Sequence, residues 1–304
     1  MTNINHTFRV LMLLLLISIT PGTMVAQVVS NLPFNKIAVP DSLHTTIDRA
    51  NFVALHYWDL FNFNDTAYIH APEVTEQAFA NYVGLVAFAA PTVATEGINL
   101  FLKRADANSK VFDYFNTLFE KYLYEPNSPL CNEELYIPVL QYLVASPSVD
   151  QLTKQTYEFR LKMALKNRKG TKATNLKFES RNGVTQQLND IFTDRNVLLI
   201  FFDPNCEHCV EVINKLKADP FVMTMTGDGT LAVVAIYADG KKDVWKEHKS
   251  ELPEEWTVGH DLSGVYKHTL YDLKAMPTLF MLDKDKTVLL KDATLKQVQS
   301  FLRR

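Results

Sequence analysis

Hydrophobic residues recur at helical intervals through the first half of the chain and form short continuous runs in the second half. Between residues 41 and 168 they return every three or four positions, which predicts a series of amphipathic α-helices. The expected helices are residues 41–61, 75–88, 92–105, 109–122, 132–144 and 149–167. Because no signature repeats at a fixed period, a helical solenoid is not indicated, and we expect an all-α domain at 41–168 whose role the pattern does not show.

From residue 169 onward the pattern alternates between strands and helices. Continuous apolar runs at 196–202 and 231–237 are typical of strands that are buried on both faces. Further strands are expected at 176–179, 278–282 and 287–290, and helices at 206–217, 241–248, 263–271 and 294–302. This order predicts an α/β domain at 169–304, with a mixed central sheet flanked on both faces by helices.

Composition and charge narrow the class of protein. The chain has 304 residues, of which 47% are hydrophobic and 21% charged, so it is too apolar to be intrinsically disordered. At roughly 100–200 residues per domain, this length fits two domains. The net charge of -3 offers no basic surface for nucleic acid. Three cysteines are too few for a scaffold held together by disulfides.

The N-terminal segment is typical of a secretory signal peptide. An apolar run at 10–19 follows Arg9, Pro21 and Gly22 end it, and Ala26 provides a small residue for cleavage. The run is shorter than the roughly 20 residues that span a bilayer, and we expect no membrane span in the mature chain. We therefore predict a signal peptide at 1–26, a linker at 27–40, and export, to the periplasm if the source is Gram-negative.

The chemistry is expected at Cys206-Glu207-His208-Cys209, between a buried strand and a helix. Positions i and i+3 share one face of a helix, so the two sulfurs come within disulfide reach. Cys206 would lie in the first turn, where unpaired backbone N–H groups and the helix dipole favour a thiolate. Because the thiolate is the nucleophile in disulfide exchange, we predict Cys206 as the nucleophile and the less exposed Cys209 as the resolving thiol.

Metal binding is the alternative for the same residues. A structural zinc site needs about four ligands, and Cys131 is the one further thiolate available. Histidines such as His248, His260 and His268 would have to complete a zinc or copper site. We expect no metal and no cofactor at this site, a free thiol at Cys131 whose role is open, and surface positions for the histidines.

Three segments carry a family resemblance. Residues 170–173, 196–209 and 276–283 resemble the lead-in, the strand–CxxC–helix element and the cis-proline loop with its strand in the thioredoxin superfamily. The similarity is to its exported branch, which includes the TlpA/ResA-type thiol-disulfide oxidoreductases. Residues 57–59 and 120–124 are similar to an uncharacterised helical domain that precedes such domains in exported bacterial proteins.

The resemblance implies a substrate-binding loop at Met276, Pro277 and Thr278. In the family this loop contains a cis X–Pro bond, lies beside the two sulfurs and pairs with the substrate backbone. The chain departs from the family at Ile200, where thioredoxins carry a buried acid, and at Asn205, where an aromatic residue often stands. Protons for Cys209 must then be handled by water, by a neighbouring carboxylate or by the helical domain.

The two residues between the cysteines should tune the thiolate. Protonated His208 would stabilise it, while Glu207 would oppose that effect, and an exposed charge pair at 4 Å is worth about 1 kcal/mol. Such numbers do not distinguish a reductase from an oxidant or an isomerase.

The leading hypothesis is thus an exported thiol-disulfide oxidoreductase that exchanges disulfides with protein clients. If the protein reduces its clients, a membrane-bound redox partner must reduce its two cysteines again. The alternative is a binding module, in which the helical domain holds a partner and the CxxC is a structural disulfide or a copper or zinc site.

Overall fold

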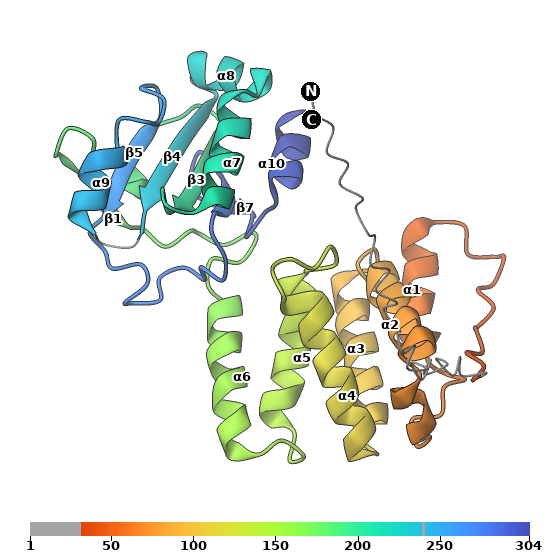
Figure 1. Ribbon diagram of the computed structural model, residues 1–304. Helices are drawn as coiled ribbons and strands as arrows, with labels where there is room; N and C mark the ends of the chain where they lie inside the picture. Colours follow the sequence, from red (N-terminus) through yellow and green to blue (C-terminus); the bar gives the residue numbers. More distant parts are fainter. Residues whose placement is uncertain (1–31, 239–240) are drawn as a thin grey trace, which may run out of the picture.

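The computed structural model describes residues 32–238 and 241–304, which form a helical region followed by a region built on a β-sheet (Figure 1). The α-helices of the helical region are α1 (Thr46–His56), α2 (Pro72–Val86), α3 (Pro91–Ala105), α4 (Ser109–Phe119), α5 (Glu133–Ala145) and α6 (Gln151–Ala164). A 3₁₀-helix, η1 (Thr66–His70), precedes α2, and a π-helical turn, η2 (Glu120–Tyr124), follows α4. The predicted all-α character of this half is confirmed.

Polar caps and prolines determine where these helices begin. The side chain of Asn108 accepts hydrogen bonds from the first backbone N–H groups of α4, and Pro91 occupies the first turn of α3, where no N–H partner is needed. Helix α1 begins later than predicted. Its cap is Thr45, whose hydroxyl accepts from the backbone N–H of Asp48 at 3.0 Å, and Asp41 lies outside the helix.

Aromatic side chains fill the centre of the helical region. Trp58, Phe101 of α3 and Phe115 of α4 are buried and meet edge to face, with ring centroids 4.8 to 5.5 Å apart. Aromatic rings prefer this geometry, and it fills the core with large apolar area. Residues 32–40, part of the expected linker, have no regular structure. Phe34 nevertheless packs on the same core, with its ring centroid 5.5 Å from that of Trp58.

The second half is built on one mixed sheet. Its strands are β1 (Lys177–Ser180), β2 (Thr185–Gln187), β3 (Asn196–Phe202), β4 (Leu231–Tyr237), β5 (Thr257–Asp261), β6 (Thr278–Asp283) and β7 (Val288–Leu290). The strand order is β2-β1-β5-β4-β3-β6-β7. Strand β3 pairs in parallel with β4 and antiparallel with β6, and β4 pairs in parallel with β5. The predicted mixed sheet is confirmed, although β2 and β5 were not expected.

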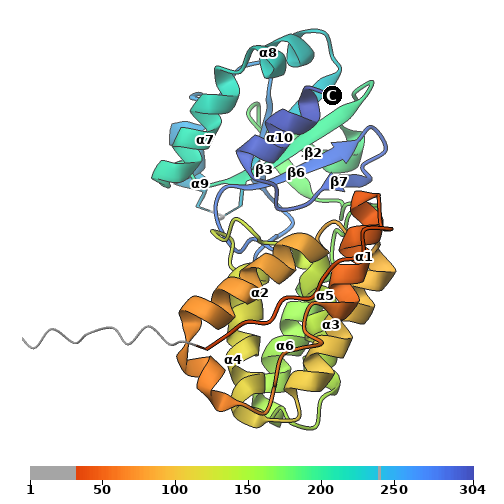
Figure 2. The ribbon, with the colours of Figure 1, turned by 90° about the vertical axis from the view of Figure 1, so that its right-hand side faces the viewer.

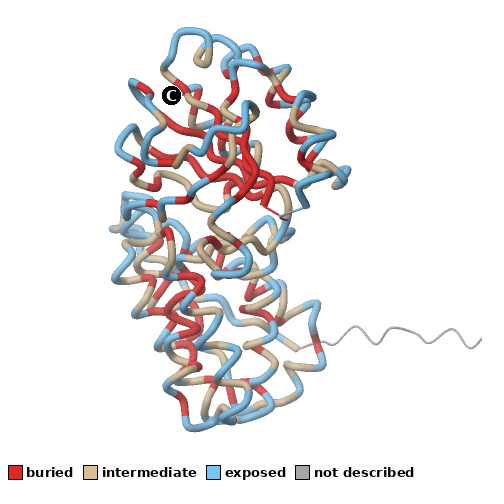
Figure 3. The backbone as a smooth tube through the Cα atoms, turned by 90° about the vertical axis from the view of Figure 1, so that its left-hand side faces the viewer, coloured by how far each residue is buried: buried red, intermediate tan, exposed pale blue. Residues whose placement is uncertain are grey.

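Helices cover one face of this sheet. They are α7 (Glu207–Lys217), α8 (Pro220–Gly227), α9 (Lys242–His248) and α10 (Leu295–Leu302), of which α8 was not predicted. Ile213, Trp245 and Val298 of these helices pack against the same face of β3 and β4. Every residue of β3 is buried, as its continuous apolar run predicts, and the buried backbone concentrates in these central strands (Figure 3).

An irregular segment and the 3₁₀-helix η3 (Leu188–Asp190) cover the opposite face, so the helix predicted at 263–271 is wrong, and within the described residues the α-helices lie on one face of the sheet. The carboxylate of Asp261 accepts a hydrogen bond from the backbone N–H of Val265 at 2.7 Å, and Gly264 adopts a φ of +64°. This left-handed turn is incompatible with a continuing α-helix. Val265 and Tyr271 are nevertheless buried on the sheet, which explains the helix-like spacing of apolar residues.

The predicted signal peptide at 1–26 and the first residues of the expected linker lie outside the described residues. Within the part of the chain that the structure describes, no helix combines the length and the apolarity that a membrane crossing requires.

The close packing of α3 on α1 depends on Gly97. A Cβ added there would lie 2.2 Å from the backbone carbonyl oxygen of Ala54, so one of the helices would have to move. We expect Gly97→Ala to lower the free energy of unfolding by about 1–3 kcal/mol in urea denaturation. The matched control is Gly84→Ala in α2, where the added Cβ meets Leu130 at an ordinary 3.8 Å. A Gly97→Ala protein as stable as the wild type would contradict this packing.

Candidate active site

Strand β3 carries the chain directly to the two cysteines. It ends at Phe202, a short turn follows, and α7 begins at Glu207 with Cys206 as its N-cap residue. The backbone N–H of Cys206 donates to the carbonyl of Asp203 at 3.1 Å, which closes the turn. The Cys206 thiol therefore lies at the helix end where unpaired N–H groups and the dipole favour an anion.

The two thiols differ in their environment. Cys206 is half-buried, whereas Cys209, one turn into α7, is completely buried, and the two side chains are within hydrogen-bond reach of each other. Burial raises the pKa of the Cys209 thiol to about 12, an effect that a hydrogen bond from the Asp203 backbone only partly offsets. Both cysteines, like Cys131, are free thiols in this structure.

The sheet brings the proline loop to the same place. Because β6 runs antiparallel to β3 with Thr278 opposite Phe201, the residues before β6 lie beside the residues after β3. The Met276–Pro277 peptide bond is cis, as predicted, and the Cys206 thiol donates to the Met276 carbonyl at 3.8 Å. The buried Thr278 hydroxyl donates to the Ala275 carbonyl at 2.6 Å and so shapes the loop from within.

The residues between the cysteines point to solvent. Glu207 and His208 are exposed, and His208 Nδ1 lies 3.5 Å from Glu211 Oε2, with the two side chains 66% and 56% exposed. An ion pair this exposed contributes little stability. This partner of His208 was not predicted, although a Glu three positions further along a helix is a local signal for such a pair.

The position of the usual buried acid is occupied by Ile200, which is completely buried in β3. Glu207 lies between the two cysteines but is exposed, whereas Asp203, three residues before Cys206, is half-buried, and its charge adds to the raised pKa of Cys209. Its Oδ1 accepts from the backbone N–H of Asn205 at 2.9 Å, so the turn itself fixes its orientation.

The remaining candidates lie in separate places. The Cys131 thiol lies 3.6 Å from the carbonyl of Leu123 in η2, and burial raises its pKa to about 11. His260, expected at the surface, is instead buried beside the rings of Tyr237 and Trp245. Within residues 32–238 and 241–304, no three His, Cys, Asp or Glu side chains lie together as a metal site would need.

A mixed sheet with a Cys-x-x-Cys at a strand–helix junction, facing a cis-proline loop, defines a thioredoxin-like protein. The chain is 41% identical to a thioredoxin-like protein from Bacteroides caccae, with a TM-score of 0.84, and the match covers 90% of this chain and 99% of that one. The chain belongs to the same family of thioredoxin-like proteins. Residues 17–167 match the family model described as a domain of unknown function, DUF5106.

Two further matches each cover less than half of this chain. The C-terminal domain of an uncharacterized protein from Bacteroides fragilis is 43% identical, over 45% of this chain and 99% of that one, with a TM-score of 0.44. The thioredoxin domain of a thiol-disulfide oxidoreductase from Bacteroides vulgatus is 18% identical, with a TM-score of 0.39, and the match covers 44% of this chain and 98% of that one. No curated protein is similar enough to the chain to count as a match.

The burial of Cys209 predicts a large difference in alkylation. Because its raised pKa leaves almost no thiolate at neutral pH, iodoacetamide at pH 7.5 should label Cys206 first and leave Cys209 almost unmodified. In Cys206→Ser, labelling of Cys209 should rise only as the pH approaches the raised pKa of about 12 or as the protein unfolds. Peptide mass spectrometry after timed quenching measures both rates. Faster labelling of Cys209 than of Cys206 would contradict the assignment.

Proposed function

We propose that the protein is an exported thiol-disulfide oxidoreductase that exchanges disulfides with protein clients through Cys206 and Cys209. The observation that carries the proposal is the position of the Cys206 thiol, at the N-terminus of α7 and 3.8 Å from the Met276 carbonyl, with Cys209 buried behind it. Export is supported by the apolar run at 10–19 and its flanking residues.

The reaction is two successive thiol exchanges. The Cys206 thiolate attacks one sulfur of a client disulfide, the client S–S bond breaks, and a mixed disulfide forms while the second client sulfur leaves as a thiolate. Cys209 then loses its proton to that thiolate and attacks the sulfur of Cys206. The mixed disulfide breaks, the client leaves with two reduced sulfurs, and the two electrons come from the Cys206–Cys209 dithiol.

The raised pKa of Cys209 fits the resolving role, because a thiol that is protonated at rest does not compete with Cys206 for the client. The client thiolate, present only after the first step, is the base that releases it. In the reverse direction the same steps oxidise a client dithiol, so the proposed chemistry is common to a reductase, an oxidant and an isomerase. A membrane-bound redox partner would restore the starting state.

The backbone of Met276 is the proposed contact for the client's peptide chain, because it lies beside the attacking sulfur. Thr278 contributes by its buried hydrogen bond to Ala275, which holds the loop in shape, and Pro277 fixes the turn between them. Glu207 and His208 remain proposed tuning residues, which act through solvent on the thiolate.

The enzyme and the binding module differ in what Cys209→Ser does. Without the resolving thiol, the mixed disulfide on Cys206 should persist, and clients should appear as bands on non-reducing gels that disappear with dithiothreitol. Cys206→Ser should lose insulin reduction entirely. The matched control is Cys131→Ser, which should retain wild-type turnover because its thiol is not part of the pair. Insulin reduction that survives Cys206→Ser would refute the proposal, as would the absence of any trapped client.

A further inference from the structure

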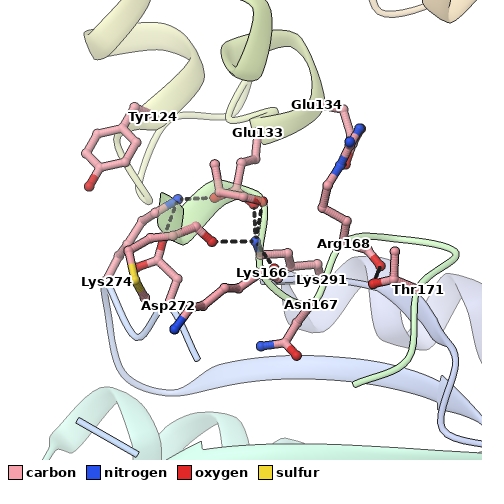
Figure 4. Close-up of polar contacts among 12 residues, drawn as sticks. Tyr124, Glu133, Glu134, Lys166, Asn167, Arg168, Thr171, Asp272, Lys274 and Lys291 are labelled. Carbon is pink, nitrogen blue, oxygen red and sulfur yellow. Dashed lines mark hydrogen bonds and ion pairs between the residues drawn. The ribbon is translucent and has the colours of Figure 1, made fainter. Parts of the chain in front are cut away.

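A buried cluster of charges joins the helical region to the loop that carries the cis-proline. Figure 4 shows Lys274 and Lys291 of the sheet region approaching Glu133 at the start of α5. Lys274 Nζ lies 2.8 Å from Glu133 Oε1, and Lys291 Nζ lies 2.5 Å from Glu133 Oε2. Each oxygen of this one carboxylate thus forms an ion pair with a different lysine of the sheet region.

The surroundings of Lys274 make this contact specific. Its side chain is only 8% exposed, its ammonium lies 3.4 Å from Asp272 Oδ2, and it lies 4.6 Å from the ring centre of Tyr124. Burial alone would lower the pKa of Lys274, but the carboxylates of Glu133 and Asp272 outweigh it and hold that pKa above its usual range. A charged lysine this deeply buried depends on its partners, because removing one leaves an uncompensated charge.

Lys291 anchors the other side of Glu133. Its ammonium donates to the backbone carbonyls of Met163, Ala164 and Lys166, at 3.3, 2.9 and 2.7 Å. These carbonyls lie at the C-terminal end of α6, where helix carbonyls lack intrahelical partners and a cation is favourable. The cluster therefore ties α5 and α6 to the sheet region at one point.

The loop before β6 is attached to the helical region at other points as well. Asn167 Nδ2 donates to the Leu270 carbonyl at 2.9 Å, and the Lys166 ammonium donates to the Thr269 carbonyl. The loop has no helix of its own to hold its shape, since its expected helix is absent. These contacts from the helical region add to those that the segment makes with the sheet through Val265 and Tyr271.

Lys274 is two residues before Met276, whose carbonyl lies 3.8 Å from the Cys206 thiol. The chain of contacts runs from Glu133 through Lys274 to the backbone beside the sulfur. Figures 1 and 2 both show the N-terminal end of α7 on the side of the sheet region that faces the helical region. The helical region is thus attached next to the redox pair.

We propose that Glu133 is a positioning residue for the proposed disulfide exchange: by holding Lys274 it fixes the Met276 backbone against which a client's peptide chain binds. The inference rests on the proposed function for its effect on clients, but not for its effect on the loop. It gives the helical region a role, which is to set the affinity for protein disulfides. A small disulfide that makes no backbone pairing does not use this contact.

The test compares Glu133→Gln, Lys274→Gln and the double variant, which removes one charge of each sign and so keeps the net charge of the cluster. The matched control is Glu76→Gln, which removes another Glu–Lys pair within the helical region, that with Lys121. Circular dichroism establishes that each variant is folded. The double variant keeps the test valid if a single variant, with one unpaired buried charge, does not fold.

Two readouts are measured on each variant. Hydrogen–deuterium exchange follows the peptide spanning 272–279, whose protection reports local opening whether or not the protein is an enzyme. Kinetics compare KM for insulin with the rate constant for 5,5′-dithiobis(2-nitrobenzoate), a small disulfide. We expect faster exchange in 272–279 and a rise in KM of about fivefold to tenfold, with the small-disulfide rate unchanged. The effects of the two single variants should not add in the double variant, since both remove the contact between Glu133 and Lys274.

The outcomes separate the two proposals. If exchange in 272–279 and KM both match those of Glu76→Gln, the positioning role is wrong while the proposed function stands. If the wild type reacts with neither disulfide, the proposed function fails. If hydrogen–deuterium exchange in 272–279 is still faster in the Glu133 and Lys274 variants, their contact nevertheless stabilises the loop. Equal losses with insulin and with the small disulfide would also overturn the positioning role, because they would indicate general damage to the thiol pair.

Discussion

The antiparallel pairing of β3 with β6 is the constraint on which the site depends. Two residues opposite each other in this ladder, Phe201 and Thr278, determine that the end of one strand and the start of the other share an edge of the sheet. Cys206 and Met276 are 70 positions apart in the chain, yet this register brings them to the same edge of the sheet. A slip by one residue would turn the side chains of β6 to the wrong face and separate the loop from the sulfur.

Burial then makes two chemically identical thiols different. Cys206 is the N-cap residue of α7 and lies beside the loop, while Cys209 is part of the hydrophobic face that α7 packs against the sheet. Removing a thiol from water disfavours its thiolate, so burial is the main cause of the raised pKa of Cys209, and the charge of Asp203 adds to it. The family's buried carboxylate is absent because Ile200 occupies its position, and the turn before α7 contributes the half-buried carboxylate of Asp203.

Much of this arrangement was predictable from local patterns, and the failures have physical causes. Strands β3 and β4 were predicted with their observed bounds, because a fully buried parallel strand is apolar throughout. Strand β5 was missed since Gly259, His260 and Asp261 look polar in the chain, although His260 and Asp261 are buried. The glycine is needed there because the ring of Phe178 lies where its Cβ would be.

The features of the site also divide into those that a local sequence pattern predicts and those that it does not. The cysteine pair and the cis bond at Pro277 follow from short motifs, and both were predicted. Contacts such as Glu133 with Lys274, which are 141 positions apart, depend on how two folded regions meet, and no local pattern records that. The exposed pairing of His208 with Glu211 was within reach of a helical-spacing argument, whereas the burial of His260 was not.

The central claim is that Cys206 and Cys209 form one reversible two-electron couple. A redox titration measures it most directly: equilibrate the protein in dithiothreitol buffers of graded potential, trap free thiols by alkylation, and count modified sulfurs by mass. We expect a single transition in which both cysteines change together, with a slope of about 30 mV per tenfold change in the oxidised-to-reduced ratio. A pair that stays reduced, or stays oxidised, at every potential would contradict it.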